Sequence, residues 1–182
     1  NPRWQETNML MSLCTAEEWL KKDTCIVSYS DIVYGSDSVG ILKEAKGDIA
    51  ITYDPHWLKL WKTRFENPLA DAETFQIDPQ GFITEIGSRA KSLDEIKGQY
   101  MGLLKFSPAG WKKVEELLSG LTPLEQDKLD MTSLLKRLLL KGIKITAVPI
   151  CGSWYEVDSE KDLLLYNAMM EKKVNAGLCR PM

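Results

Sequence analysis

Short apolar segments alternate along this chain with longer segments in which apolar residues recur at helical spacing. Thr24–Tyr29, Ile49–Tyr53, Gln99–Phe106 and Ile143–Ile150 are dominated by apolar residues, which is typical of strands buried on both faces. Strands that alternate with helices pair mainly in parallel, and the helices then cover both faces of the sheet. The pattern therefore predicts an α/β fold with a mostly parallel, Rossmann-like sheet.

The helical segments have recognisable starts and stops. Thr7 or Asn8 can cap the first of them, Pro108 stands at the first position of another, and Gly142 suits the left-handed end of a third. The segments expected to be helical are Thr7–Lys22, Val39–Ala45, Trp57–Phe65, Ala109–Leu118, Asp130–Lys141 and Ser159–Lys172.

Two further short strands are predicted outside the parallel part of the sheet. Glu73–Ile77 and Phe82–Ile86 flank the turn residues Asp78-Pro-Gln-Gly81, which is the pattern of a hairpin. We expect this hairpin to be a small antiparallel insertion. Trp154–Val157 reads as the last strand of the chain.

Composition limits the class of protein. With 182 residues, of which 44% are hydrophobic, the chain can bury one substantial core. No repeat, linker or low-complexity segment interrupts it, so we expect one catalytic domain over residues 1–173 and a loose tail over 174–182. Four scattered cysteines and a single histidine, His56, give a disulfide framework or a zinc site little to build from.

Charge and hydropathy limit the partners. The net charge is −3, which argues against binding to nucleic acid or to a membrane surface. No apolar segment approaches the ~20 residues that span a bilayer, and no signal-peptide pattern opens the chain. The expected location is the cytoplasm.

Carboxylates follow two of the predicted strands. Asp31 comes directly after Thr24–Tyr29, and Glu156 and Asp158 close the last strand, where alternation points both to the same side. Ligands of open α/β sheets bind beyond the carboxyl ends of the strands, and Mg²⁺ prefers hard oxygen ligands. These three residues are candidate Mg²⁺ ligands. In the alternative interpretation, Asp31 and Asp158 are ordinary helix caps.

Five short strings resemble one known family when they are taken in order. They are Ser28-Tyr-Ser-Asp31, Glu85-Ile-Gly87, Gly98-Gln-Tyr-Met-Gly-Leu-Leu-Lys-Phe106, Leu129-Asp-Met-Thr132 and Gly152-Ser-Trp-Tyr-Glu-Val-Asp158. The chain resembles the nucleotidyltransferases from Asn1 to about Tyr166, and within them the phosphocholine cytidylyltransferase branch, which is related to sugar-1-phosphate nucleotidyltransferases. The resemblance implies a nucleotide-diphospho-sugar transferase-like fold.

The resemblance also implies a reaction. Asp31 and Asp158 would be catalytic and would hold Mg²⁺ with Glu156. A phosphate or phosphonate oxygen of a small acceptor would attack the α-phosphorus of a nucleoside triphosphate, with CTP favoured, and pyrophosphate would leave. Such chemistry depends on positioning and charge neutralisation and needs no protein nucleophile. Arg64 and Lys105 could neutralise phosphate, or they could simply be solvated.

Aromatic and acidic residues are candidate contacts for an amine-bearing acceptor such as phosphocholine. Trp57 follows a strand end, and aromatic faces recognise quaternary ammonium groups. By resemblance, Trp57 occupies the place of a choline-contacting tryptophan, and Glu85 that of an acceptor contact in enzymes acting on sugar phosphates. Tyr100, Asp130 and Trp154 complete the predicted set. Trp57 equally fits a helix face packed on the core, and Glu85 a solvated turn.

One part of the family pattern is not found. Its members begin with a strand and a glycine-rich loop that cradles the phosphates, whereas the 12 glycines here are dispersed. We expect the chain to be the C-terminal two-thirds of an enzyme, with roughly 60–80 residues supplied by a fused or separate N-terminal segment. Thr7 and Asn8 match the family stretch near the nucleotide. A sugar-1-phosphate nucleotidyltransferase and a truncated, non-catalytic ligand-binding module remain as alternatives.

Overall fold

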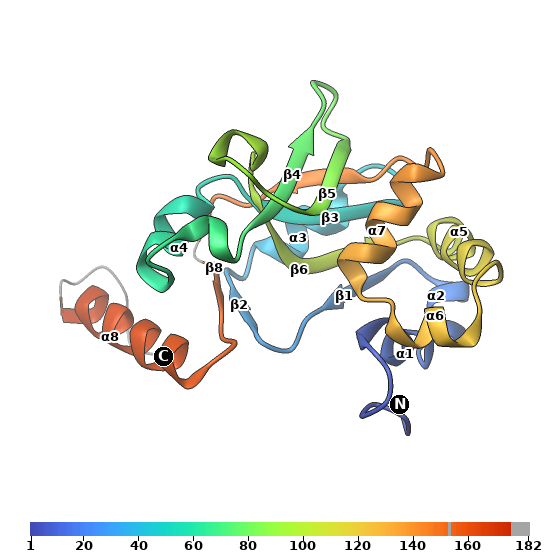
Figure 1. The fold of residues 1–182 in the computed structure, drawn as a ribbon, viewed down its shortest axis with the longest axis horizontal. Helices are drawn as coiled ribbons and strands as arrows, with labels where there is room; N and C mark the ends of the chain where they lie inside the picture. Colours follow the sequence, from blue (N-terminus) through green and yellow to red (C-terminus); the bar gives the residue numbers. More distant parts are fainter. Residues whose placement is uncertain (153, 176–182) are drawn as a thin grey trace.

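The computed structural model describes residues 1–152 and 154–175, the last three by their backbone alone. A four-stranded sheet forms its centre, in the order β1 (Cys25–Ser28), β6 (Gln99–Phe106), β3 (Ile49–Asp54) and β7 (Thr146–Pro149). Helices pack on both faces of this sheet (Figure 1). The predicted α/β fold with a helix-covered central sheet is confirmed.

β1, β3 and β7 point in the same direction, and β6 runs the opposite way between β1 and β3. β3 and β7 pair in parallel, whereas β6 is antiparallel to both of its neighbours. The expectation of mostly parallel pairing is therefore corrected. The reason lies in the connection: Tyr53 pairs with Tyr100 and Asp54 with Gln99, so the chain re-enters the sheet at the end where β3 left it.

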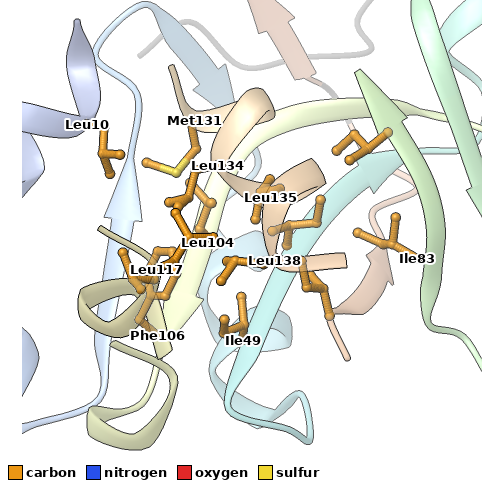
Figure 2. Close-up of a cluster of buried hydrophobic side chains, with 14 of the residues drawn as sticks. Leu10, Ile49, Ile83, Leu104, Phe106, Leu117, Met131, Leu134, Leu135 and Leu138 are labelled. Carbon is orange, nitrogen blue, oxygen red and sulfur yellow. The ribbon is translucent and has the colours of Figure 1, made fainter. Parts of the chain in front are cut away.

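Side chains alternate across the sheet and divide the core into two parts. Ile49 and Ile51 of β3 share one cluster with Leu104 of β6, while Ala50 and Leu103 belong to the cluster on the opposite face. Figure 2 shows the first cluster, in which leucines of the helix over the sheet meet the strand residues. Burial on both faces explains why these strands are nearly continuous in apolar residues.

Each core cluster has its own helices. The first is covered by α5 (Pro108–Leu118) and α7 (Met131–Leu140), with α1 (Met9–Cys14) and α2 (Glu17–Lys22) beside α5 and α6 (Pro123–Lys128). The second is covered by α3 (Ser38–Glu44) and α4 (Trp57–Arg64). α6 was not among the predicted helices, although Thr122 and Glu125 form a reciprocal capping box at its start.

Most of the predicted helix boundaries are confirmed. The side chains of Asn8, Ser107 and Asp130 cap α1, α5 and α7, and Gly142 follows α7 at φ +75°. The single helix expected over Thr7–Lys22 is wrong, because the chain breaks between α1 and α2. At the break the Thr15 hydroxyl donates to the Ser12 carbonyl, a local bond that competes with helix continuation.

The predicted hairpin is confirmed as β4 (Glu73–Ile77) and β5 (Ile83–Arg89), between the short 3-10 turns η1 (Pro68–Ala70) and η2 (Leu93–Glu95). The Asp78 carboxylate accepts from the N–H groups of Gln80 and Phe82 and thereby closes the turn. The hairpin projects from the sheet beside α7 (Figure 1).

A second antiparallel pair joins β2 (Ile32–Tyr34) to β8 (Trp154–Glu156), and α8 (Glu160–Asn175) follows it. β8 was predicted, whereas β2 is too short to stand out from sequence. α8 runs two residues beyond the expected domain end, and the rest of the expected tail lies outside the described residues. No helix in the described ranges combines the length and apolar character that crossing a membrane requires.

Candidate active site

A pocket of about 220 Å³ lies where β1 ends and β6 begins, next to the β4–β5 hairpin. Four carboxylates line it: those of Asp71 and Glu73 from the hairpin side, and those of Glu156 and Asp158 from the end of β8. We call it the acidic pocket. Its other lining residues are Tyr29, Thr74, Phe75, Ile86, Gly98, Gln99, Tyr100, Gly102 and Thr132.

Two tyrosines form one wall of the acidic pocket. The rings of Tyr29 and Tyr100 meet edge to face, with centroids 5.9 Å apart and an interplanar angle of 85°. Burial raises the pKa of both phenols, so both stay protonated near neutral pH. The wall is therefore aromatic and uncharged near neutral pH and adds no further anion to the pocket.

A glycine in β6 allows the ring of Tyr29 to approach the β6 backbone closely. Gly102 of β6 has φ +76°, and a Cβ atom built there would lie 2.8 Å from the ring of Tyr29. The absent side chain at Gly102 is therefore what allows Tyr29 to lie flat against β6.

Arg64, at the end of α4, binds the carboxylates behind the pocket. Its guanidinium donates to Glu156 at 3.1 Å, to Asp158 at 2.6 Å and to Asp162 at 2.9 Å. Its side chain is only 1% exposed. Burial alone would lower the pKa of this guanidinium, but the bonds to Asp162 and Asp158 outweigh it and raise the pKa.

Glu156 is the carboxyl group whose ionisation is most disfavoured. Burial, together with the neighbouring charge of Asp158, raises its pKa to about 7, against the opposing effect of Arg64. Glu73 shows a smaller change in the same direction: burial, then the charges of Asp130 and Asp71, raise its pKa. Crowded anions of this kind favour the approach of a cation.

Asp31 lies beside the acidic pocket rather than in it. The exposed side chain of Asp31 lines a neighbouring pocket of about 380 Å³ between α1 and β1. Its carbonyl accepts a 2.8 Å bond from the N–H of Val157, and Ile32 pairs with Glu156. Tyr29 lines both pockets. The three predicted metal ligands are thus brought to adjoining segments, although sequence separates them by more than 120 positions.

The described residues contain no ready group of three or more His, Cys, Asp or Glu side chains arranged to hold a metal. Two of the candidate ligands each give one oxygen to Arg64: Oε2 of Glu156 and Oδ2 of Asp158. The donors present are the carboxylate oxygens that Mg²⁺ prefers, in a number that suits an ion held jointly with substrate phosphates and water.

Two of the three predicted aromatic contacts, Trp57 and Trp154, lie in the core instead. Their exposed fractions are 4% and 3%. Trp57 meets Trp61 edge to face at 6.0 Å, and Trp154 stacks on the other side of the same cluster, 5.6 Å from Trp61. Neither lines the acidic pocket, so the packing alternative for Trp57 describes its position. Tyr100 is the predicted aromatic residue that does line the pocket.

The remaining predicted acceptor residues face elsewhere. Glu85 pairs with Gln76 on the exposed face of the hairpin, since alternation turns Ile86 rather than Glu85 toward the pocket. Asp130 caps α7, accepting from the backbone N–H of Ser133 at 2.6 Å and from its hydroxyl at 2.9 Å. It acts on the pocket only through its charge, near Glu73 and Tyr29.

Thr7 and Asn8, the predicted nucleotide contacts, stand just before α1. The Asn8 side chain accepts from the Met9 N–H, and the Thr7 hydroxyl accepts from the Asn1 amide. Neither is among the residues that line the neighbouring pocket, whereas Met9 and Ser12 of α1 are. Lys105, a candidate for phosphate, donates to the Ala45 carbonyl instead.

Sequence reasoning predicted Glu156, Asp158 and Tyr100 but missed the other acidic and aromatic residues of the pocket. Asp71 and Glu73 lie at the start of the hairpin, where nothing in the local pattern marks them. Tyr29 and Thr132 were not singled out either, although both stand inside strings that carry the family resemblance. The ion pairs of Arg64 with Glu156, Asp158 and Asp162 could not be predicted from residue spacing, because these acids lie more than 90 positions away in sequence.

Comparisons with known proteins identify the class of protein to which this chain belongs. No family model matches the chain. It is 38% identical over 177 residues to the CTP:phosphoglutamine cytidylyltransferase of Campylobacter jejuni, covering 90% of this chain and 68% of that protein. The chain belongs to the nucleotidyltransferase superfamily, which confirms the resemblance at that level.

Solved structures agree on the fold. The inositol-1-phosphate CTP transferase of T. maritima superposes with a TM-score of 0.68 at 16% identity, and matches 92% of this chain. A glucose-1-phosphate thymidylyltransferase from Bacillus anthracis, described as putative, gives 0.65 at 18% identity and matches 90%. The chain spans 63% and 61% of these two structures, less than two-thirds of their length.

Proposed function

We propose that this chain carries the acceptor site of a cytidylyltransferase, which joins CTP to a small phosphorylated or phosphonate acceptor and releases pyrophosphate. The choice of CTP is supported by the 38% identical relative, which is named for CTP and phosphoglutamine. The acceptor oxygen attacks the α-phosphorus in line. The chain contributes position and charge, and no nucleophile of its own.

The acidic pocket is the observation that carries the proposal. Four carboxylates line it, and the guanidinium of Arg64 beside them is already bound by Glu156, Asp158 and Asp162. Such a lining attracts a cationic group and repels a second anion. We therefore propose an acceptor that carries an ammonium group in addition to its phosphorus. Phosphocholine and 2-aminoethylphosphonate meet this requirement, and phosphoglutamine also carries an ammonium group, although beside a carboxylate.

The pocket favours these acceptors over sugar phosphates. A sugar-1-phosphate offers hydroxyl groups and no positive charge, so it would add no charge partner for Asp71, which accepts from the Trp61 indole N–H, or for Glu73, which lies near the charge of Lys136. Tyr29 and Tyr100 add aromatic faces that suit a quaternary ammonium group, worth ~0.5–2 kcal/mol per contact. These two tyrosines now take the role proposed from sequence for Trp57.

Magnesium remains part of the proposal. Asp31 and Asp158 are the residues that would hold it, Asp158 through the oxygen that Arg64 does not bind, with Glu156 nearby. The bound ion would supply charge neutralisation at the phosphate oxygens. The neighbouring pocket, beside Asp31, α1 and the predicted contacts Thr7 and Asn8, is the proposed nucleotide side. Tyr29 stands between the two substrates.

The test is pyrophosphate release by the complete protein in which this chain occurs. CTP and Mg²⁺ are held fixed, and phosphoglutamine, phosphocholine, 2-aminoethylphosphonate and glucose-1-phosphate are compared as acceptors. Turnover with one of the three ammonium-bearing compounds supports the proposal. Turnover with glucose-1-phosphate alone identifies a sugar-1-phosphate nucleotidyltransferase. Saturable binding of an acceptor without turnover identifies a non-catalytic binding module.

A further inference from the structure

We propose that Arg64 is a positioning residue of the active site, which holds Glu156 and Asp158 so that both carboxylates face the acidic pocket. The inference rests on the proposed function, because it concerns residues of the same site. Nothing in the family resemblance pointed to it. It comes from the contacts of one buried side chain.

The geometry around Arg64 is that of a three-way clamp. Nη1 donates to Oε2 of Glu156, Nη2 to Oδ2 of Asp158, and Nε to Oδ1 of Asp162. A guanidinium is planar and presents its N–H groups in a fixed fork, so three simultaneous bonds fix the directions of all three carboxylates. The clamp joins α4 to the end of β8 and the start of α8, 92 to 98 positions apart in sequence.

The three carboxylates divide into two kinds. Asp162 lies behind the guanidinium with its side chain 10% exposed, and it also accepts from the Ser159 hydroxyl at 2.8 Å. Glu156 and Asp158 line the pocket and are more open, at 23% and 51%. Within the described residues, each of these two carboxylates uses only one oxygen on Arg64. The other oxygen of each is left for a ligand.

Packing holds the guanidinium itself in place. Its central carbon lies 5.0 Å from the ring centroids of both Trp61 and Phe65. Trp61 is fully buried and stacks on Trp154 of β8. Because the aromatic rings and Asp162 fix Arg64 from behind, the guanidinium can transmit that fixed position to the two carboxylates in front of it.

A lysine at residue 64 distinguishes a positioning role of Arg64 from a role of its charge alone. Arg64→Lys keeps the positive charge but offers a single ammonium that cannot bond three carboxylates in one plane. If Arg64 only neutralises charge, the lysine variant restores function. If Arg64 positions the carboxylates, the lysine variant fails. Arg137→Lys on α7 is the matched control, because it makes the same chemical change at a residue that lines neither the acidic pocket nor the neighbouring pocket.

The experiment compares Arg64→Lys, Arg137→Lys and wild type in the complete protein, with thermal unfolding as the check on folding. We expect Arg64→Lys to unfold within a few degrees of wild type. We expect its kcat to fall ~100-fold, the loss associated with a misplacement of about 1 Å, while KM for CTP changes less than about threefold. A wild-type kcat in Arg64→Lys, or a loss that only follows the unfolded fraction, overturns the proposal.

A second readout does not depend on turnover. Binding of Mn²⁺ in the presence of CTP, followed by electron paramagnetic resonance, should weaken at least ~fivefold in Arg64→Lys although the charge is unchanged. Unchanged Mn²⁺ affinity contradicts the positioning role. If the wild-type protein turns over no acceptor, the proposed function is wrong, but Mn²⁺ binding still tests whether Arg64 has a positioning role.

A third variant covers the case in which Arg64→Lys does not fold. Asp162→Asn removes the charged anchor of the guanidinium and changes no residue that lines the pocket. We expect a threefold or larger fall in kcat with the unfolding temperature little changed. Wild-type kcat in a folded Asp162→Asn protein would then count against the clamp.

Discussion

The backbone N–H of Val157 donates a 2.8 Å hydrogen bond to the carbonyl of Asp31. This bond extends the β2–β8 pairing by one step and brings the segment after β1 against the segment after β8. As a result Asp31, Glu156 and Asp158 lie on adjoining backbone segments, between two pockets that share Tyr29. The relation between these two backbone groups underlies the placement of nucleotide and acceptor proposed above.

Replacing Asp31 or Asp158 by asparagine should abolish most transfer activity. Each change removes one negative charge from the proposed magnesium ligands, and a metal acting as Lewis acid contributes several kcal/mol to such reactions, so kcat should fall by ~100-fold or more. The measurement is pyrophosphate release at saturating CTP and Mg²⁺. Asp94→Asn, at an exposed position in η2, is the control. Full activity in a folded Asp31→Asn protein would show that Asp31 is no metal ligand.

Glu73→Gln should weaken binding of an ammonium-bearing acceptor. The change removes one of the negative charges that line the acidic pocket, and hydrogen bonds to charged groups are worth ~1.5–3 kcal/mol when they are fully formed. Because part of this side chain is in solvent, we expect about 1–2 kcal/mol, a five- to thirtyfold rise in acceptor KM. Glu85→Gln on the exposed face of the same hairpin should leave KM unchanged. Equal effects of the two variants would remove Glu73 from the acceptor site.

Stability should decrease as pH rises through the range in which Glu156 ionises. In the folded protein its pKa is raised from 4.5 to about 7, so between these values the folded state binds the proton more tightly than the unfolded chain does. The contribution of this group is therefore favourable at low pH and is lost toward pH 7.

Glu156→Gln isolates that contribution, since glutamine resembles the neutral acid. Relative to wild type, the variant should gain about 1–3 kcal/mol of unfolding free energy between pH 5 and pH 8. Urea unfolding at several pH values measures the difference. A pH-independent difference would mean that Glu156 ionises in the folded protein as it does in water.

Gly102→Ala should destabilise the protein and disturb the tyrosine wall. At φ +76° an alanine is strained, and its Cβ would lie 2.8 Å from ring atoms of Tyr29. We expect a loss of about 1–3 kcal/mol in unfolding free energy and weaker acceptor binding. Gly40→Ala within α3 is the matched control: its Cβ would meet nothing within 4 Å, so it should be neutral or stabilising. A neutral Gly102→Ala would show that the backbone at β6 adapts without cost.

The features that could be predicted from the sequence are those that neighbouring residues determine. Strands β3 and β6 are mostly apolar because both of their faces are buried, and the caps Asn8, Ser107 and Asp130 act within one helical turn. The reversal of β6 depends on where a long insertion returns the chain, which no local pattern encodes.

The site residues likewise divide into those that the local sequence indicates and those that it does not. Asp31, Glu156 and Asp158 were predicted because carboxylates at strand ends carry a positional meaning, and the structure brings them to adjoining segments. Trp57 was predicted to contact the acceptor but packs in the core. A helix face that follows a strand end can turn either to the ligand or to the core, and here Trp57 packs on Trp61, which stacks on Trp154. The Arg64 clamp connects residues more than 90 positions apart, so it becomes visible only in the folded chain.

The central claim is that the acidic pocket selects an acceptor by its ammonium group during cytidylyl transfer. The most direct measurement compares kcat/KM for phosphoethanolamine and for 2-hydroxyethyl phosphate, which differ only in an ammonium against a hydroxyl, in the complete protein with CTP and Mg²⁺. The account predicts a preference of at least ~tenfold for the ammonium compound, lost in Glu73→Gln. Equal turnover of the two compounds, or a preference for the hydroxyl, would contradict it.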